Sequence, residues 1–140
     1  MAVRPHDLES IAPVIGSFKI SQTASVDDLK DTNIGEAVTI SGNSTVSPCG
    51  VGDVLLGKLL DLTLTDADDG DRVASVQIGG ICRLKISATF PTVGDRVVGA
   101  ASGTIKQAPL LAVDDPAGGN IARGTVVDVN GTTDCLLILN

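Results

Sequence analysis

From Gly35 onward, the chain consists of short apolar stretches rich in Val, Ile, Leu and Thr, which Gly, Asp, Asn and Pro interrupt about every ten residues. This spacing is typical of an all-β domain with tight turns between its strands. In RVASVQI, Ala74, Val76 and Ile78 alternate with mostly polar positions, as expected for a strand with one buried face. The pattern predicts strands over residues 37–41, 54–65, 72–78, 82–87, 96–99, 104–107, 121–129 and 133–139.

Two dipeptides between neighbouring apolar stretches predict hairpin turns. Asp69-Gly70 and Asn130-Gly131 each combine two residues that tolerate a positive φ angle, which tight hairpin turns require. Asn-Gly favours the type I′ turn, whose twist matches that of the flanking strands. We therefore expect residues 126–129 and 133–139 to form a C-terminal hairpin.

The first 33 residues differ in composition from the rest of the chain. They contain Pro5, Pro13 and the polar, acid-rich stretch SQTASVDDLKDTN. This composition predicts an N-terminal arm over residues 1–33, partly extended or mobile, followed by a β domain over residues 34–140. Within the arm, SVDDLKD predicts one helical turn, because the Ser25 hydroxyl can accept an unpaired backbone N–H and the aspartates favour the positive end of a helix.

Two phrases of the β domain occur twice, in the same order. GEAVTISGNSTV, which starts at Gly35, matches GDRVVGAASGTI, which starts at Gly94, without a gap. GKLLDL, from Gly57, matches GTVVDV, from Gly124. The preserved order favours a duplicated β unit. The alternative is that Gly-Asp-x-Val phrases recur wherever a tight turn leads into a strand.

The two matches place the copies at about residues 35–87 and 94–139, with offsets of 59 and 67 residues between corresponding positions. The second copy is thus eight residues longer, and the difference falls in the loop around LLAVDDPAGGN. Because a small β unit cannot bury its apolar face alone, two related units should close together. The expected fold is all-β, a small barrel or sandwich built from two related β units, with an extended N-terminal arm.

Composition and charge exclude several classes of partner. The chain has 140 residues, enough for one domain, and lacks the run of roughly 20 apolar residues that a membrane span needs. The start MAVRPHDLES also lacks the apolar run of a secretory signal. A net charge of −7 disfavours binding to phosphates, and the absence of Trp and Tyr disfavours stacking on bases or sugars. We therefore expect no membrane and no nucleic acid as partners.

Cysteines and aspartates are the residues that invite a chemical interpretation. Cys49, Cys82 and Cys135 have wide, irregular spacing, which predicts buried thiols in a reducing compartment rather than a metal site or a disulfide framework. The loop TDADDGD, with four aspartates from Asp66 to Asp71, leaves two interpretations open: a calcium loop or a solvated hairpin turn. A full EF-hand would need Glu at the position of Gln77, which favours the turn.

Catalysis is not expected. His6 is the single histidine and lies near the terminus, so neither a Ser-His pair nor a histidine metal cluster can be assembled in one chain. Asp114-Asp115 and the Asp66–Asp71 group are candidates for acid–base chemistry, but aspartates in Pro- and Gly-rich loops are more often solvated turns. We expect no enzyme, no cofactor and no metal.

Several phrases together resemble a family of phage and prophage head decoration proteins, also called capsid cement proteins. The resemblance covers residues 34–140 and includes GEAVTISGNSTV, GDVLLGKLLDL, VASVQIGGICRLKI, PTVGDRVVGAASGTIK, and IARGTVVDV followed by CLLIL. Typical of that family are a G-D-x-V-x-G phrase, glycine at the end of a central strand, and A-x-G before a final hairpin. Here they fall at residues 94–99, 79–80 and 122–124.

The resemblance implies a β-rich homotrimer on the outside of an icosahedral head. Its partners would be the major capsid protein and itself, and its location the head surface of a virion made in the cytoplasm of a bacterial host. It would stabilise the shell without catalysis. A tail or baseplate component, or another ligand-binding β adaptor module, is the alternative within the same fold class.

Under this hypothesis, the arm supplies the contact with the shell. The candidate capsid-contact residues are Ile11, Val14, Ile15, Phe18, Lys19 and Ile20. FKI, at residues 18–20, is the segment expected to add as a strand to an exposed edge of the shell. The alternative is that these residues pack on the domain of their own chain. Phe90 and Pro91 are either core residues or a contact between subunits.

Overall fold

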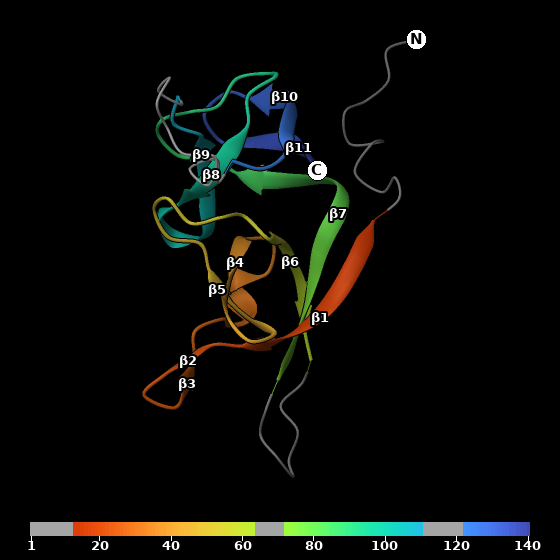
Figure 1. Ribbon diagram of the computed structural model, residues 1–140, viewed down its shortest axis with the longest axis vertical. Helices are drawn as coiled ribbons and strands as arrows, with labels where there is room; N and C mark the ends of the chain where they lie inside the picture. Colours follow the sequence, from red (N-terminus) through yellow and green to blue (C-terminus); the bar gives the residue numbers. More distant parts are fainter. Residues whose placement is uncertain (1–12, 64–71, 111–121) are drawn as a thin grey trace.

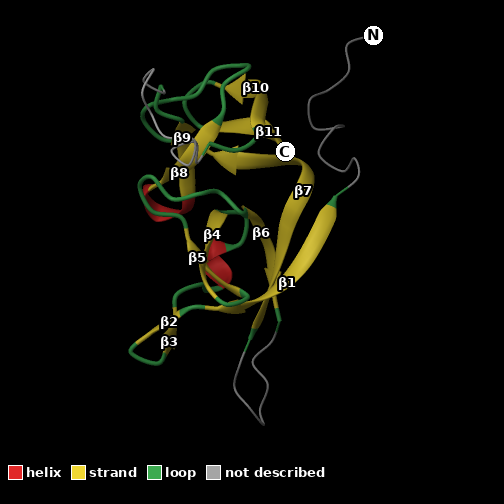
Figure 2. Cartoon of the chain, in the orientation of Figure 1, coloured by secondary structure: helices red, strands yellow, loops and turns green. Residues whose placement is uncertain are grey.

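The computed structural model describes residues 13–63, 72–110 and 122–140, and these residues form β-strands joined by turns (Figures 1 and 2). Two single turns of 3₁₀ helix, η2 (Asp31–Asn33) and η3 (Ala101–Gly103), interrupt them. The strands are β1 (Val14–Ile20), β2 (Gln22–Thr23), β3 (Val26–Asp27), β4 (Ala37–Gly42), β5 (Thr45–Pro48), β6 (Gly57–Leu62), β7 (Val73–Lys85), β8 (Val97–Ala100), β9 (Thr104–Gln107), β10 (Thr125–Asn130) and β11 (Asp134–Leu139).

Five strands close into a barrel. β1 pairs with β5, β5 with β4, β4 with β6 and β6 with β7, and β7 returns to pair with β1. The pair β1–β5 is parallel and short, at Lys19 opposite Thr45 and Ile20 opposite Val46, whereas the other four pairs are antiparallel. Closure leaves the first barrel with few unpaired strand edges.

A second group of strands follows the same plan. β7 continues beyond the first barrel to pair with β11, and β11 pairs with β10 (Figure 1). The β8–β9 hairpin joins this group through two isolated bridges, Val97 with Arg123 and Ile86 with Ile105. The second bridge is parallel, like the pair β1–β5 of the first barrel. In the second group, the second half of β7 therefore takes the place of β1, and β9, β8, β10 and β11 take the places of β5, β4, β6 and the first half of β7.

The correspondence extends to individual hydrogen bonds. The Gly35 N–H donates to the Leu59 carbonyl at 2.7 Å, and the Gly94 N–H donates to the Val126 carbonyl at 2.8 Å. Both glycines have a left-handed φ, 94° and 92°, which explains why glycine opens both copies of the phrase. An accidental recurrence of turn phrases would not reproduce this pairing. The prediction of an all-β fold with two related β units is confirmed.

One long strand, β7, serves both groups. The sequence pattern predicts two strands here, over residues 72–78 and 82–87, but the structure has a single strand of 13 residues. The strand continues because the buried Gln77 side chain donates from Nε2 to the Gly79 and Ile81 carbonyls at 3.0 and 3.1 Å, across the glycine pair. The predicted break is therefore wrong.

The described part of the predicted N-terminal arm lies in the first barrel. β1 pairs with β7 from Val14 to Lys19, and Ile20 and Leu29 are buried in the barrel core. The first unit therefore begins at β1, which corresponds to the second half of β7, and residue 34 marks no boundary between an arm and a domain. Residues 1–12, with Ile11, lie outside the described residues.

The helical turn predicted for SVDDLKD is wrong. β2 and β3 form a small antiparallel hairpin there, and Ser25 has a φ of 64° in its turn. Polar side chains hold the hairpin, because Asp28 accepts hydrogen bonds from the Ser21 and Thr23 hydroxyls at 2.6 and 2.8 Å. The same hydrogen bonds lower the pKa of the Asp28 carboxyl. The aspartates thus bond to the preceding strand and not to the start of a helix.

Two buried clusters fill the fold. The core of the first barrel consists of Ile20, Leu29, Val38, Val46, Leu59, Leu62, Ala74 and Val76. The core of the second group consists of Ala37, Cys49, Leu55, Cys82, Leu84, Ile86, Val97, Ile105, Val126, Cys135, Leu137 and Leu139. Three members of the second core, Ala37, Cys49 and Leu55, come from the first unit. The two units therefore share apolar packing as well as a strand.

Candidate interaction surfaces

A loop of the first unit pairs with the edge of β8 in the second unit. The Gly52 N–H donates to the Gly99 carbonyl at 3.0 Å, and the Gly99 N–H donates to the Asp53 carbonyl at 2.7 Å. A Cβ on Gly99 would stand 2.8 Å from the Gly50 carbonyl oxygen, so only glycine permits this approach. We refer to residues 49–53 as the docked loop, because it fills the edge of β8.

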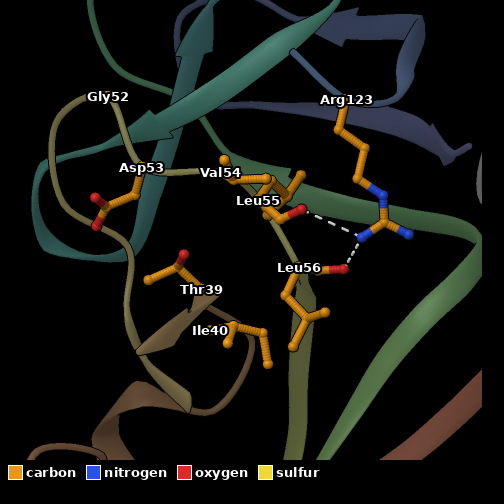
Figure 3. Close-up of a pocket in the computed structure, with 8 residues that line it drawn as sticks. All are labelled: Thr39, Ile40, Gly52, Asp53, Val54, Leu55, Leu56 and Arg123. Atoms are coloured by element: carbon orange, nitrogen blue, oxygen red, sulfur yellow. Dashed lines mark hydrogen bonds between the residues drawn. The ribbon is translucent and has the colours of Figure 1, made fainter. Parts of the chain in front are cut away.

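Arg123 holds the two units together from the other side. Its guanidinium donates to the carbonyls of Leu55, at 3.2 Å, and of Leu56 (Figure 3). It also donates to the Ile78 carbonyl, and all three acceptors lie in the first unit. Burial lowers the pKa of this guanidinium, which nevertheless remains charged, as arginine does in proteins. The cation thus satisfies carbonyls at the point where β7 passes from one unit to the other.

A groove opens beside β4, between this strand and the segment that leads into β6. It measures about 610 Å³ and is lined by Thr39, Ile40, Gly52, Asp53, Val54, Leu55, Leu56 and Arg123 (Figure 3). Ile40 and Val54 are each 48% exposed at its rim. In the register of β4 with β5, the Ile40 N–H and carbonyl point away from β5. Within the described residues, no hydrogen bond occupies them. We call this site the β4 groove.

The candidate capsid-contact residues divide between surface and core. Val14 and Ile15 are 54% and 56% exposed. Lys19 is exposed as well, whereas Phe18 is half-buried against the core of the first barrel and Ile20 is buried in it. The FKI segment thus pairs with strands of its own chain, which was the alternative interpretation. Because β5 meets β1 only at residues 19 and 20, the start of β1 is left with an unpaired side in the described structure.

Phe90 and Pro91 also separate. Pro91 is buried, whereas Phe90 is 43% exposed. The pair is therefore neither a core site nor a surface site as a whole, and only Phe90 is placed to contact another molecule.

All three cysteines are buried thiols, as predicted. Burial, reinforced by the Asp53 carboxylate, raises the pKa of the Cys49 thiol to about 12. Burial, with smaller contributions from Cys82 and Asp134, also raises the pKa of the Cys135 thiol to about 12. These thiols therefore stay protonated at neutral pH.

Several residues considered above as candidates for catalysis or metal binding lie outside the described ranges, namely His6, the Asp66–Asp71 loop and Asp114-Asp115. Among the residues that are described, no three His, Cys, Asp or Glu side chains come together as a metal site. No helix in these ranges is long and apolar enough to cross a membrane.

Comparison of the chain with protein-family models, with curated proteins and with solved structures finds no match. The interaction surfaces are therefore defined by the structure alone. The β1 edge was among the sequence candidates, but the β4 groove was not. The one sequence signal for the groove is the mismatch between Ile40 and Gly99, which occupy the same position in the two copies.

Proposed function

We propose that the protein decorates the outside of an icosahedral phage head as a homotrimer and stabilises the shell by binding the major capsid protein. The observation that carries the proposal is the start of β1, where Val14 and Ile15 are more than half exposed on a strand that has one side unpaired within the described residues. The resemblance of residues 34–140 to head decoration proteins supports the same assignment.

The physical argument concerns strand addition. An unpaired strand edge offers backbone N–H and carbonyl groups to an extended segment of a partner, and flanking apolar side chains add affinity. A homotrimer would present three such edges to neighbouring capsid subunits. Linked contacts of this kind raise overall binding by roughly 10² to 10⁴ without new chemistry. The proposed role is mechanical, with no catalysis and no cofactor.

Co-sedimentation with expanded heads tests this proposal. We expect the double variant Val14→Asp, Ile15→Asp to bind at least about tenfold more weakly, because each charge loses its hydration at the contact. Val93→Asp is the matched control, since Val93 is 66% exposed in a turn remote in sequence from β1. Circular dichroism would establish that both variants fold. Equal binding by the double variant and the wild type would refute the role of β1.

A further inference from the structure

Each of the two units has a strand edge at the same place, and among the described residues only one of these edges has a partner. In the second unit, the docked loop occupies the edge of β8 at Gly99. Ile40 is the residue of β4 that corresponds to Gly99, 59 residues earlier. Its N–H and carbonyl face the β4 groove, and no described residue pairs with them. The groove is therefore the counterpart of a site that the chain itself fills elsewhere.

The counterpart of the docked loop is the loop that follows β9. Both loops leave their units in the same way, because the Cys49 N–H donates to the Ala37 carbonyl at 3.1 Å and the Ala108 N–H donates to the Arg96 carbonyl at 2.9 Å. Residues 50–54, which include most of the docked loop, read GVGDV, whereas the corresponding residues 109–113 after β9 read PLLAV and are entirely apolar. Leu110, the second residue of that sequence, is 94% exposed.

We propose that the β4 groove of one chain receives the loop after β9 of a second copy, so that the contact between the two units of one chain is repeated between chains. The loop after β9 is eight residues longer than its counterpart, which adds up to roughly 26 Å of reach. That reach suits a partner outside its own unit. The apolar sequence also suits a groove rimmed by Ile40 and Val54.

The contact at Gly99 within the chain and the proposed contact at Ile40 between chains differ in how closely the two backbones approach. The docked loop approaches Gly99 so closely that a Cβ there would meet a carbonyl oxygen at 2.8 Å. Ile40 carries a side chain, so the incoming loop lies at the spacing of an ordinary strand pair, about 4.8 Å, and packs beside that side chain. The groove provides the additional width.

A contact of this kind is head-to-tail, since each chain offers one groove and one loop that fit different surfaces. Head-to-tail contacts close into a ring when the rotation allows it. Three chains would form a ring of six β units in which contacts within and between chains alternate. The inference rests on the proposed function only for the number of chains in the ring, because the contact between copies does not require a phage head.

Two variants of the full chain test the inference by complementation. Ile40→Lys blocks the groove and leaves the loop intact, whereas deletion of residues 113–120 shortens the loop to the length of its counterpart and leaves the groove intact. Sedimentation should show that the wild type is an oligomer and that each variant alone is a monomer. A mixture of the two variants should form a one-to-one pair, through the single groove and the single loop that remain.

Val51→Lys is the matched control, because Val51 lies in the docked loop, whose contact is already made within the chain, and is 69% exposed. It should assemble like the wild type. A monomeric wild type, assembly of Ile40→Lys or of the loop deletion alone, or a mixture of these two variants that stays monomeric would each overturn the inference. Head binding is measured separately: assembly that persists in both variants together with head binding overturns the inference alone, whereas an oligomer that depends on the groove and the loop but fails to bind heads overturns only the proposed function.

Discussion

Arg123 occupies the position that Leu56 holds in the first unit, and the exchange of an apolar residue for a cation has a clear structural result. In the first unit, the Leu56 N–H donates to the Val38 carbonyl, and in the second the Arg123 N–H donates to the Val97 carbonyl in the same way. The backbone is thus conserved between the units, while the Arg123 side chain crosses to the other unit and binds three carbonyl groups.

Removing this guanidinium should destabilise the whole protein. We expect Arg123→Met to lower the free energy of unfolding by about 1–3 kcal/mol, because three carbonyls at the junction lose the charged donor that they share. Urea unfolding followed by circular dichroism measures the change. Arg96→Met serves as the control, since Arg96 is exposed and makes a single 3.4 Å hydrogen bond to the Ala122 carbonyl. Equal losses for the two variants would contradict the role of Arg123.

At the scale of the element, the sequence pattern predicts strands best where turn residues delimit them on both sides. Residues 104–107 were expected as a strand and form β9 over the same residues, and 37–41 differs from β4 by one residue. β5 was missed because TVSP is short and ends in proline, which is unusual in a strand. The single strand β7 depends on the Gln77 side chain, an interaction that hydrophobic periodicity does not contain.

The interaction surfaces were less predictable than the strands. The exposure of Val14 and the burial of Ile20 depend on which strands flank β1, and β1 closes the barrel through pairs far away in sequence. The β4 groove exists because, among the described residues, one strand edge has no partner after the barrel closes. No local pattern of apolar and polar residues specifies that outcome. The internal repeat identifies Ile40 and Gly99 as corresponding positions, but only the fold shows that both lie at strand edges.

The repeated phrase that begins at Gly57 also allows a test at the element scale. A Cβ on Gly57 would stand 1.9 Å from the Gln77 carbonyl oxygen on the neighbouring β7. Gly57→Ala should therefore push β6 and β7 apart and lower the melting temperature, at a cost of about 1–3 kcal/mol. Gly42→Ala in β4 is the control, because its Cβ would meet Thr45 at an ordinary 3.6 Å. A wild-type melting temperature for Gly57→Ala would show that the strands can separate without cost.

At the scale of the whole molecule, the two units should behave as one cooperative body. They share β7, and the second core contains Ala37, Cys49 and Leu55 from the first unit. Opening either unit therefore exposes apolar surface of the other. Shared packing of this kind favours a single unfolding transition.

Alkaline pH should destabilise this shared core, which contains both Cys49 and Cys135. The pKa values of Cys49 and Cys135 rise from 9.0 to about 12 on folding, so above pH 9.0 the folded state retains protons that the unfolded state releases. The contribution of the two thiols to stability is thus complete below pH 9.0. It falls as the pH rises towards 12, by up to about 1.4 kcal/mol per thiol for each pH unit. Urea unfolding at several pH values above 9.0 measures the slope.

The double variant Cys49→Ala, Cys135→Ala is the control for this measurement. It starts from a lower stability, because two core side chains are smaller, but its stability should change less with alkaline pH. A slope equal to that of the wild type would mean that the thiols do not govern the alkaline loss. Two separate unfolding transitions would show that the units are independent.

The pairing of β7 also brings the start of β1 and the end of β11 to neighbouring residues of one strand, a place that we call the seam. Val14 lies opposite Gly79, and Leu139 lies opposite Gly80, so the start of β1 and the end of β11 adjoin at the middle of a single strand. A circular permutation could join these two strands with a short linker and keep every strand neighbour. Peptides displayed before β1 and after β11 would emerge together from this seam.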